Sequence, residues 1–329
     1  FAQLADRLVR GLGARVVVTG TRAEEALVRD VISRMEERGR ALDAAGRLSV
    51  LALGAVLERA GALVTNDTAP VHLGSALGTA VFALAVTAQA TPLEPTTWSQ
   101  AIEQLAFNDG QGRLICVSAG NAASADIGLL AGYPQLNLVQ SIQDPAQAWN
   151  ALTVGAYTDR DRMPSDDTYR GYAPIAPAGG ISPHSSSRPL DASRVPNKPE
   201  IVFEGGNVAF DGALPDATVS TLTTLTTGHR PNRPLASIWA TSEAAARAAH
   251  LGASVWSANP DLRPETVRGL MVHAATWTAR MREQFESLDD RLRICGYGVP
   301  DGSMATWCAR ERATIVIEDS MPNAVMVDK

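Results

Sequence analysis

Short apolar runs alternate with amphipathic stretches along most of this chain, and this alternation constrains the fold more than any other feature. Buried strands are predicted at Arg15–Thr19, Ala62–Thr65, Ala80–Val86, Arg113–Val117, Ala151–Tyr157 and Ile201–Phe203. Helices are predicted at Leu48–Ala60, Pro70–Leu77, Thr97–Phe107, Ser242–Ser257 and Pro264–Thr276. Strands joined through helices form a parallel sheet with helices on its faces. The predicted fold class is therefore α/β, with a doubly wound parallel sheet.

The overall composition excludes several classes of function. A net charge of −6 and a pI near 5.4 leave no basic face for nucleic acid. No apolar run approaches the roughly 18 residues that a membrane span needs. The three cysteines show no metal-ligand spacing, and Cys116 is expected to be a buried free thiol. With no visible signal peptide, we expect a cytoplasmic protein without a metal or cofactor.

One candidate site lies where the strand Leu114–Val117 runs into Ser118-Ala119-Gly120-Asn121. A side-chain amide at the end of a rigid strand is a neutral, fixed donor, which is the kind of group that stabilises an oxyanion. Taken alone, a Gly-Asn turn that merely ends a strand is the simpler interpretation.

A second candidate is Ser242, which follows Ala240-Thr241 at the start of an Ala-rich helix. Backbone N–H groups and the helix dipole favour negative charge at such a place, so a serine there suits acyl transfer. A plain helix cap formed by Thr241 or Ser242 is the structural alternative.

Together with Ala151–Ala156 and Lys198–Val202, these motifs resemble the C-terminal portion of subtilisin-like serine peptidases, over about residues 88–320. Further stretches resemble a subset of cytoplasmic bacterial subtilases: Asp144–Asn150, Val272–Thr278 and Cys295–Asp301. The resemblance implies a subtilase-like core that hydrolyses a peptide or protein substrate. It also implies that Ser242 is the nucleophile and Asn121 the oxyanion donor.

The sequence departs from the family pattern around the nucleophile. Ala240 replaces a glycine, and the carboxylate of Glu243 would stand beside the developing oxyanion, where like charge is unfavourable. The aspartate and histidine motifs of the family are not found, so we expect an impaired endopeptidase, because a serine without a base is a weak nucleophile. Asp67 and His72 follow the family's order of roles but stand much closer together than the family places them.

The first part of the chain, about residues 1–84, resembles the nucleotide-sugar-binding half of glycosyltransferase family 9, the heptosyltransferases. Val64–Leu73 carries most of this resemblance, with Asp67, Thr68 and His72 near the start of a predicted helix. The resemblance implies that these three residues bind the diphosphate of a nucleotide-sugar. A structural cap on a buried helix would use the same residue types.

Two units are therefore predicted. Residues 1–86 form a partial Rossmann-like nucleotide-sugar-binding unit, and residues 87–329 form a partial peptidase domain that lacks the Asp and His motifs. Because the strand Ala80–Val86 suits both families, a single continuous sheet is expected. Asp159–Asn197, with the serine run Ser185–Ser187, is predicted to be irregular surface. Besides a serine endopeptidase, the alternatives are a glycosyltransferase and a non-catalytic binding scaffold.

Overall fold

The computed structural model describes residues 2–60, 62–65, 81–89, 94–107, 112–122, 132–188, 196–230 and 233–311. The helices are α1 (Ala2–Leu12), α2 (Glu25–Ser33), α3 (Val50–Glu58), α5 (Thr97–Phe107), α7 (Leu136–Val139), α8 (Ala240–Ala258), α9 (Pro264–His273), α10 (Ala279–Gln284), α11 (Leu288–Cys295) and α12 (Gly302–Glu311). Among these residues, no helix is long and apolar enough to cross a membrane.

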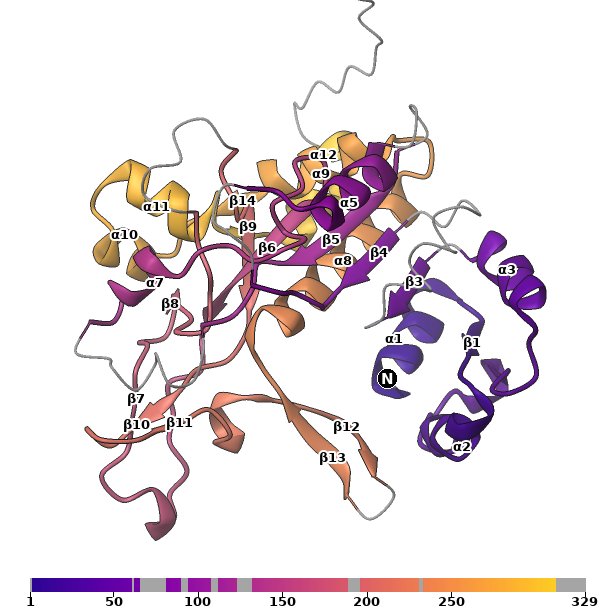
Figure 1. The fold of residues 1–329 in the computed structure, drawn as a ribbon, viewed down its shortest axis with the longest axis horizontal. Helices are drawn as coiled ribbons and strands as arrows, with labels where there is room; N and C mark the ends of the chain where they lie inside the picture. Colours follow the sequence, from indigo (N-terminus) through magenta and orange to yellow (C-terminus); the bar gives the residue numbers. More distant parts are fainter. Residues whose placement is uncertain are drawn as a thin grey trace, which may run out of the picture.

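A central sheet contains β3 (Ala62–Thr65), β4 (Val81–Leu84), β5 (Leu114–Ser118), β6 (Leu152–Thr158) and β9 (Ile201–Glu204) (Figure 1). These five strands are parallel and adjacent in that order. A short strand, β8 (Gly180–Ile181), pairs antiparallel with the end of β6. The α/β class and the positions of the main strands are therefore confirmed.

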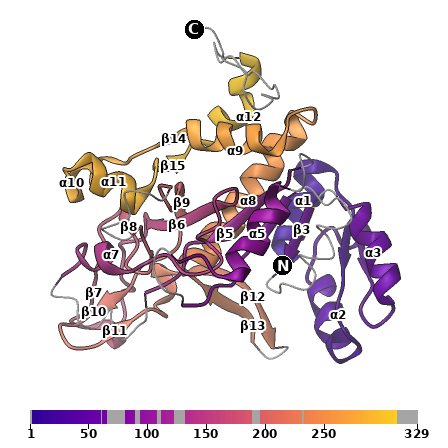
Figure 2. The same cartoon turned by 45° about the horizontal axis from the view of Figure 1, so that its top comes forward.

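Helices cover both faces of this sheet because its strands are apolar on both sides. Val81 and Ala83 of β4 face a core formed with α8 and α9, whereas Phe82 and Leu84 face the opposite core, formed with α5. Figure 2 shows the same arrangement from a second direction. Strands buried on both faces have continuous apolar sequences, which explains why their positions were predictable.

Helix α8 approaches the sheet closely at Gly252. A Cβ atom there would lie 2.4 Å from Cδ2 of Leu114 on β5, so no larger residue fits without movement. The alanines of α8 permit the same close contact, and Ala244, Ala245 and Ala248 are fully buried. The contact between α8 and β5 therefore fixes where the first turn of α8, with Ser242, lies.

The first predicted strand does not join the central sheet. β1 (Val16–Val18) pairs only with β2 (Ala41–Asp43), in a separate two-stranded parallel sheet. We call residues 2–60 the N-terminal unit; Figure 1 shows it in indigo and purple beside the central sheet. The expectation of one continuous sheet holds from β3 onward but is wrong for β1, whose short run of three valines does not specify its neighbours.

The segment 159–197 was predicted to be irregular surface, and for the run Ser185–Ser187 this is wrong. Ser185, Ser186 and Ser187 are at most 1% exposed. The hydroxyl of Ser185 accepts a hydrogen bond from the backbone N–H of Ala156, and that of Ser187 donates to the carbonyl of Asn137. Backbone partners thus allow the Ser185 and Ser187 hydroxyls to be buried, whereas the buried hydroxyl of Ser186 has no partner among the described residues. Composition alone does not reveal such partners.

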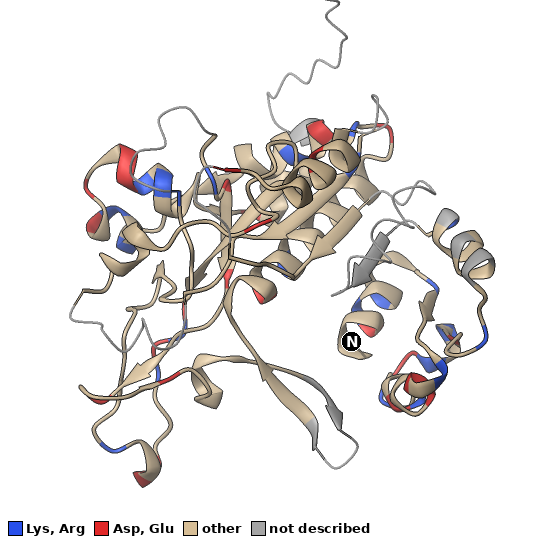
Figure 3. Ribbon diagram, in the orientation of Figure 1, with Lys and Arg blue, Asp and Glu red and all other residues tan. Residues whose placement is uncertain are grey.

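The remaining strands form small antiparallel sheets. They are β7 (Ala173–Pro174) with β10 (Ala209–Phe210) and β11 (Pro215–Asp216), β12 (Thr224–Arg230) with β13 (Arg233–Ile238), and β14 (Ala275–Thr276) with β15 (Val299–Pro300). We call the β12–β13 hairpin the arm, because it projects from the body in Figure 1. Figure 3 shows that charged residues concentrate in the N-terminal unit and in α10 and α11, whereas the sheet strands are almost free of them.

Candidate functional site

Ser242 lies in the first turn of α8, at the carboxyl ends of the parallel strands. Its Oγ donates to the backbone carbonyl of Ala85, directly after β4, at 3.4 Å. The side chain is half-buried. Ligand sites of open α/β sheets lie at this end of the strands, where loops and helix N-termini converge.

Asn121 lies beside this turn and is held to it by Thr241. The Oδ1 atom of Asn121 accepts from the backbone N–H of Thr241 at 3.0 Å and from its hydroxyl at 2.6 Å. Because the amide oxygen has two donors, the Nδ2 group of Asn121 is left to donate elsewhere, and among the described residues none accepts from it. The structure therefore brings the two peptidase candidates to adjacent positions.

The turn that carries Asn121 is fixed by a second amide side chain. Gln143 donates from Nε2 to the carbonyl of Asn121 at 3.1 Å, and its Oε1 accepts from the hydroxyl of Thr87 at 2.7 Å. Gly120 has a φ of 107°, and a Cβ there would lie 2.6 Å from Cγ of Gln143. A glycine is thus needed both for the backbone conformation and for the close approach.

Sequence reasoning missed the parts played by Thr241, Gln143 and Thr87. Thr241 was considered only as a helix cap, although the residue is fully buried and bonds Asn121. Gln143 lies 22 residues after Asn121, so no local pattern pairs them. The need for glycine at position 120 was the one available sign that another side chain approaches this turn.

Ala240 has a φ of 68°, the one left-handed conformation of a non-glycine residue among the residues described. Its N–H donates to the carbonyl of Gly205 at 2.6 Å. The sequence places alanine where the family has glycine, and the backbone keeps the conformation that glycine adopts most easily. The turn before Ser242 is therefore strained and must be held by its surroundings.

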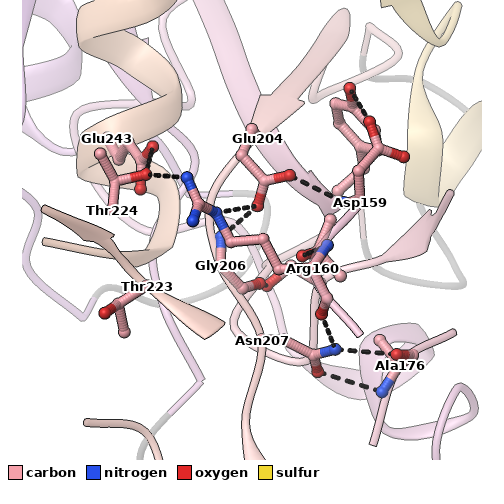
Figure 4. Close-up of polar contacts among 12 residues, drawn as sticks. Asp159, Arg160, Ala176, Glu204, Gly206, Asn207, Thr223, Thr224 and Glu243 are labelled. Carbon is pink, nitrogen blue, oxygen red and sulfur yellow. Dashed lines mark hydrogen bonds and ion pairs between the residues drawn. The ribbon is translucent and has the colours of Figure 1, made fainter. Parts of the chain in front are cut away.

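The carboxylate of Glu243 was expected to oppose charge at the oxyanion, but in the structure its charge is paired elsewhere. Its Oε1 accepts from the hydroxyl of Thr224 at 2.5 Å and from Nη2 of Arg247 at 2.6 Å. Burial raises the pKa of Glu243, and the Thr224 and Arg247 contacts oppose that rise. Figure 4 shows Glu243 turned toward Thr224, in a polar network that extends to Glu204.

No described histidine is hydrogen-bonded to Ser242. His184 is buried and its Nε2 has no partner; burial lowers its pKa to about 4, so its imidazole is neutral at pH 7. His250 follows Ser242 by eight residues on α8, which is about 12 Å along the axis, and His273 is exposed on α9. The side chain of His229 lies outside the described part of the structure, as does all of His72.

The three residues of the nucleotide-sugar prediction, Asp67, Thr68 and His72, lie outside the described residues. Within the ranges that the structure describes, no group of three or more His, Cys, Asp or Glu side chains could hold a metal ion. The geometry that can be assessed is therefore that of Ser242 and Asn121.

Comparisons with known proteins point to one family. The sequence model described as the subtilase family matches residues 52–298 of this chain. The match begins inside the segment assigned to the first predicted unit, so it includes β3 and β4 as well as the later strands. No curated protein matches the chain.

Several solved structures of proteases are similar. One from Pseudoalteromonas arctica is 16% identical, with 70% of this chain and 51% of that chain covered and a TM-score of 0.43. The prenylagaramide maturation protease PagA is 14% identical, with 92% and 88% covered and a TM-score of 0.49. MycP1 without its N-terminal propeptide is 20% identical, with 81% and 70% covered and a TM-score of 0.43. The chain thus spans about half the length of the first of these structures.

Proposed function

Because this chain belongs to the subtilase family, we propose that it is a serine endopeptidase relative that binds a peptide at Ser242 and Asn121. The observation that carries the proposal is the pair of hydrogen bonds from Thr241 to Oδ1 of Asn121. These bonds orient the amide so that Nδ2 is free to donate, directly beside the residue that precedes Ser242.

The proposed chemistry follows from this arrangement. Oγ of Ser242 attacks the carbonyl carbon of the peptide and loses its proton to solvent water, while the electrons of the carbonyl π bond move to the oxygen, which becomes negatively charged. Nδ2 of Asn121 and the backbone N–H of Ser242 donate to that oxygen, and the N-terminal end of α8 favours the charge. Such donors act where charge develops, so they lower the barrier to reaction more than they strengthen peptide binding.

We propose further that the activity is impaired. Oγ of Ser242 donates only to the carbonyl of Ala85 within the part of the chain that the structure describes, and no basic side chain there accepts its proton. Serine is a weak nucleophile at its ordinary pKa unless an adjacent base activates it. The expected reaction with peptides is therefore slow, and acylation of Ser242 is the step that is limited.

A fluorophosphonate probe tests this proposal directly, because it phosphonylates activated serines. We expect slow labelling of the purified chain, lost in Ser242→Ala and reduced about a hundredfold or more in Asn121→Ala, as for loss of one oxyanion donor. Ser242→Ala should leave the fold intact, because Oγ makes only one long hydrogen bond, of 3.4 Å.

Absence of labelling in a chain that melts cooperatively would reject the peptidase proposal and favour the non-catalytic scaffold. Labelling that survives in Ser242→Ala would mean that another residue reacts. The glycosyltransferase alternative stays a prediction that depends on Asp67, Thr68 and His72.

A further inference from the structure

Both ends of the arm lie next to the turn that leads into Ser242. β13 ends at Ile238, and after Trp239 the chain enters α8 at Ala240. β12 begins at Thr224, which pairs with Ile238 across the hairpin. The first residue of the arm therefore lies beside the last, next to the turn that leads into Ser242.

The side chain of Glu243 connects the first turn of α8 with Thr224, the first residue of the arm. Its Oε1 accepts from the hydroxyl of Thr224 at 2.5 Å, and from Arg247 through Nη2 at 2.6 Å and Nε at 2.9 Å. Glu243 is 4% exposed, so its carboxylate is sheltered from water, although the side chain of Arg247 is 40% exposed. A carboxylate buried to this extent is stable only while its partners remain in place. We call Glu243, Thr224 and Arg247 the latch.

The latch is tied in turn to the ends of two sheet strands (Figure 4). Nη2 of Arg160, just after β6, donates to the hydroxyl of Thr224 at 2.8 Å. Nε of Arg160 lies 3.7 Å from Oε1 of Glu204, the last residue of β9. Glu204 accepts from the backbone N–H groups of Gly206 and Asp159, each at 2.7 Å. The base of the arm is thus fixed to the sheet as well as to α8.

The turn between the arm and α8 needs such support. Ala240 holds a φ of 68°, which is unfavourable for a residue with a Cβ, and a strained conformation persists only when its surroundings determine it. The hydrogen bond from Ala240 to Gly205 holds one side of the turn. On the other side, Glu243 is the residue directly after Ser242, and its side chain holds the arm.

We propose that Glu243 is a positioning residue whose latch to Thr224 holds the strained turn, and with it the orientation of Ser242. As far as it concerns catalysis, the proposal rests on the proposed function. It assigns a use to the residue that seemed least compatible with an oxyanion site, since the latch keeps the charge of Glu243 paired with Arg247.

Hydrogen–deuterium exchange tests the latch without any need for activity. Glu243→Gln and Thr224→Val are both close in shape to the original residues, and Ser254→Ala on the exposed side of α8 is the matched control. We expect each latch variant to increase exchange of the Ala240 and Thr241 amides, which donate to Gly205 and Asn121, about tenfold or more, as for loss of a hydrogen bond to a charged group. Exchange in α9 and in the control should not change.

The double variant Glu243→Gln/Thr224→Val separates a latch from two independent contacts. If the two residues act through one link, the double variant should exchange no faster than the worse single variant. Additive increases, or unchanged exchange in the first turn of α8 in both single variants, would overturn the proposal.

Labelling by the fluorophosphonate adds the functional readout. The maximal labelling rate should fall about tenfold in Glu243→Gln, while the probe concentration for half-maximal rate stays the same, because the latch orients Ser242 and does not bind the probe. An unchanged maximal rate would contradict positioning. If the unaltered chain is not labelled at all, the peptidase proposal fails, and the exchange experiment still decides whether the latch exists.

Discussion

The N-terminal unit and the central sheet bury their side chains to very different degrees. The hydrophobic cluster of the N-terminal unit contains only four buried residues, Ala2, Ala5, Val31 and Met35, with a few partly buried neighbours, and the unit's other buried apolar residues, such as Val28, lie outside it. In the central sheet, β4 and β5 are buried along their whole length. Parallel strands are normally covered on both faces, yet Val17 of β1 is 36% exposed and Leu42 of β2 is 59% exposed.

Their charged contacts differ in the same way. Most of the described ion pairs of the N-terminal unit, such as Arg29 with Glu25, lie at the surface, and the pair of Arg34 with Asp30 is partly buried. Directly before β9 of the central sheet, by contrast, Glu200 is only 6% exposed. Its Oε1 accepts from Nζ of the buried Lys198 at 2.6 Å and from Nη2 of Arg268 at 2.5 Å. From this difference we expect the sheet that carries the candidate site to contribute most of the stability of this chain, and the N-terminal unit to contribute little.

The largest expected effect comes from the buried carboxylate. Glu200→Ala leaves Lys198 buried without its charge partner, which should lower the free energy of unfolding by about 3–5 kcal/mol. The matched change in the N-terminal unit, Glu25→Ala, should alter it by no more than about 0.5 kcal/mol, because exposed pairs contribute little. Chemical denaturation of both variants measures the two values, and equal losses would break the comparison.

A smaller effect is expected from His184, next to the turn that carries Asn121. Burial lowers the pKa of His184 from 6.5 to about 4, so between these pH values the unfolded chain binds a proton that the folded chain does not. The free energy of unfolding is therefore unaffected by His184 above pH 6.5. It decreases as the pH falls toward 4, by up to about 3 kcal/mol, because protonation favours the unfolded chain.

Melting curves from pH 4 to 7 check this expectation. His184→Phe, which cannot be protonated, should flatten the dependence of stability on pH in this range. If the unaltered chain and the variant lose stability in parallel, His184 is not the responsible group.

The smallest expected effect concerns the nucleotide-sugar prediction, which depends on Asp67, Thr68 and His72. A nucleotide diphosphate that binds only the folded chain should stabilise it by about 1.4 kcal/mol at a concentration ten times its Kd. Thermal shift measures this, with Asp67→Ala as the variant that should lose it. No shift at millimolar nucleotide would remove the glycosyltransferase alternative.

The sequence predicted most of the sheet because its signal is local. Leu114–Ser118 and Leu152–Thr158 are apolar runs whose burial on both faces determines their residue types. The arm could not be predicted in the same way. Thr224–Arg230 is rich in threonine and Arg233–Ile238 contains a proline, so neither resembles an apolar strand.

The candidate site was predictable only in part. Motifs located Ser242 and Asn121, whereas the contacts that hold them come from residues far away in the chain. Glu243 illustrates the limit. From the sequence it is an unfavourable charge beside a nucleophile, because its partner Thr224 stands 19 residues earlier, in a segment with no strand signal. The ion-pair partner Arg247 stands four residues later on α8, at a spacing that the sequence does show, whereas the contact with Thr224 is not visible in any local pattern.

The contact of Gly252 with Leu114 fixes the position of α8 along its own axis relative to β5. Ser242 stands ten residues from Gly252, about 15 Å along a rigid rod with a rise of about 1.5 Å per residue. A slip of one residue at the glycine would turn the serine by about 100° around the rod and away from Asn121. The packing of the helix against the strand at Gly252 therefore determines the direction in which the Ser242 side chain points, almost three turns away.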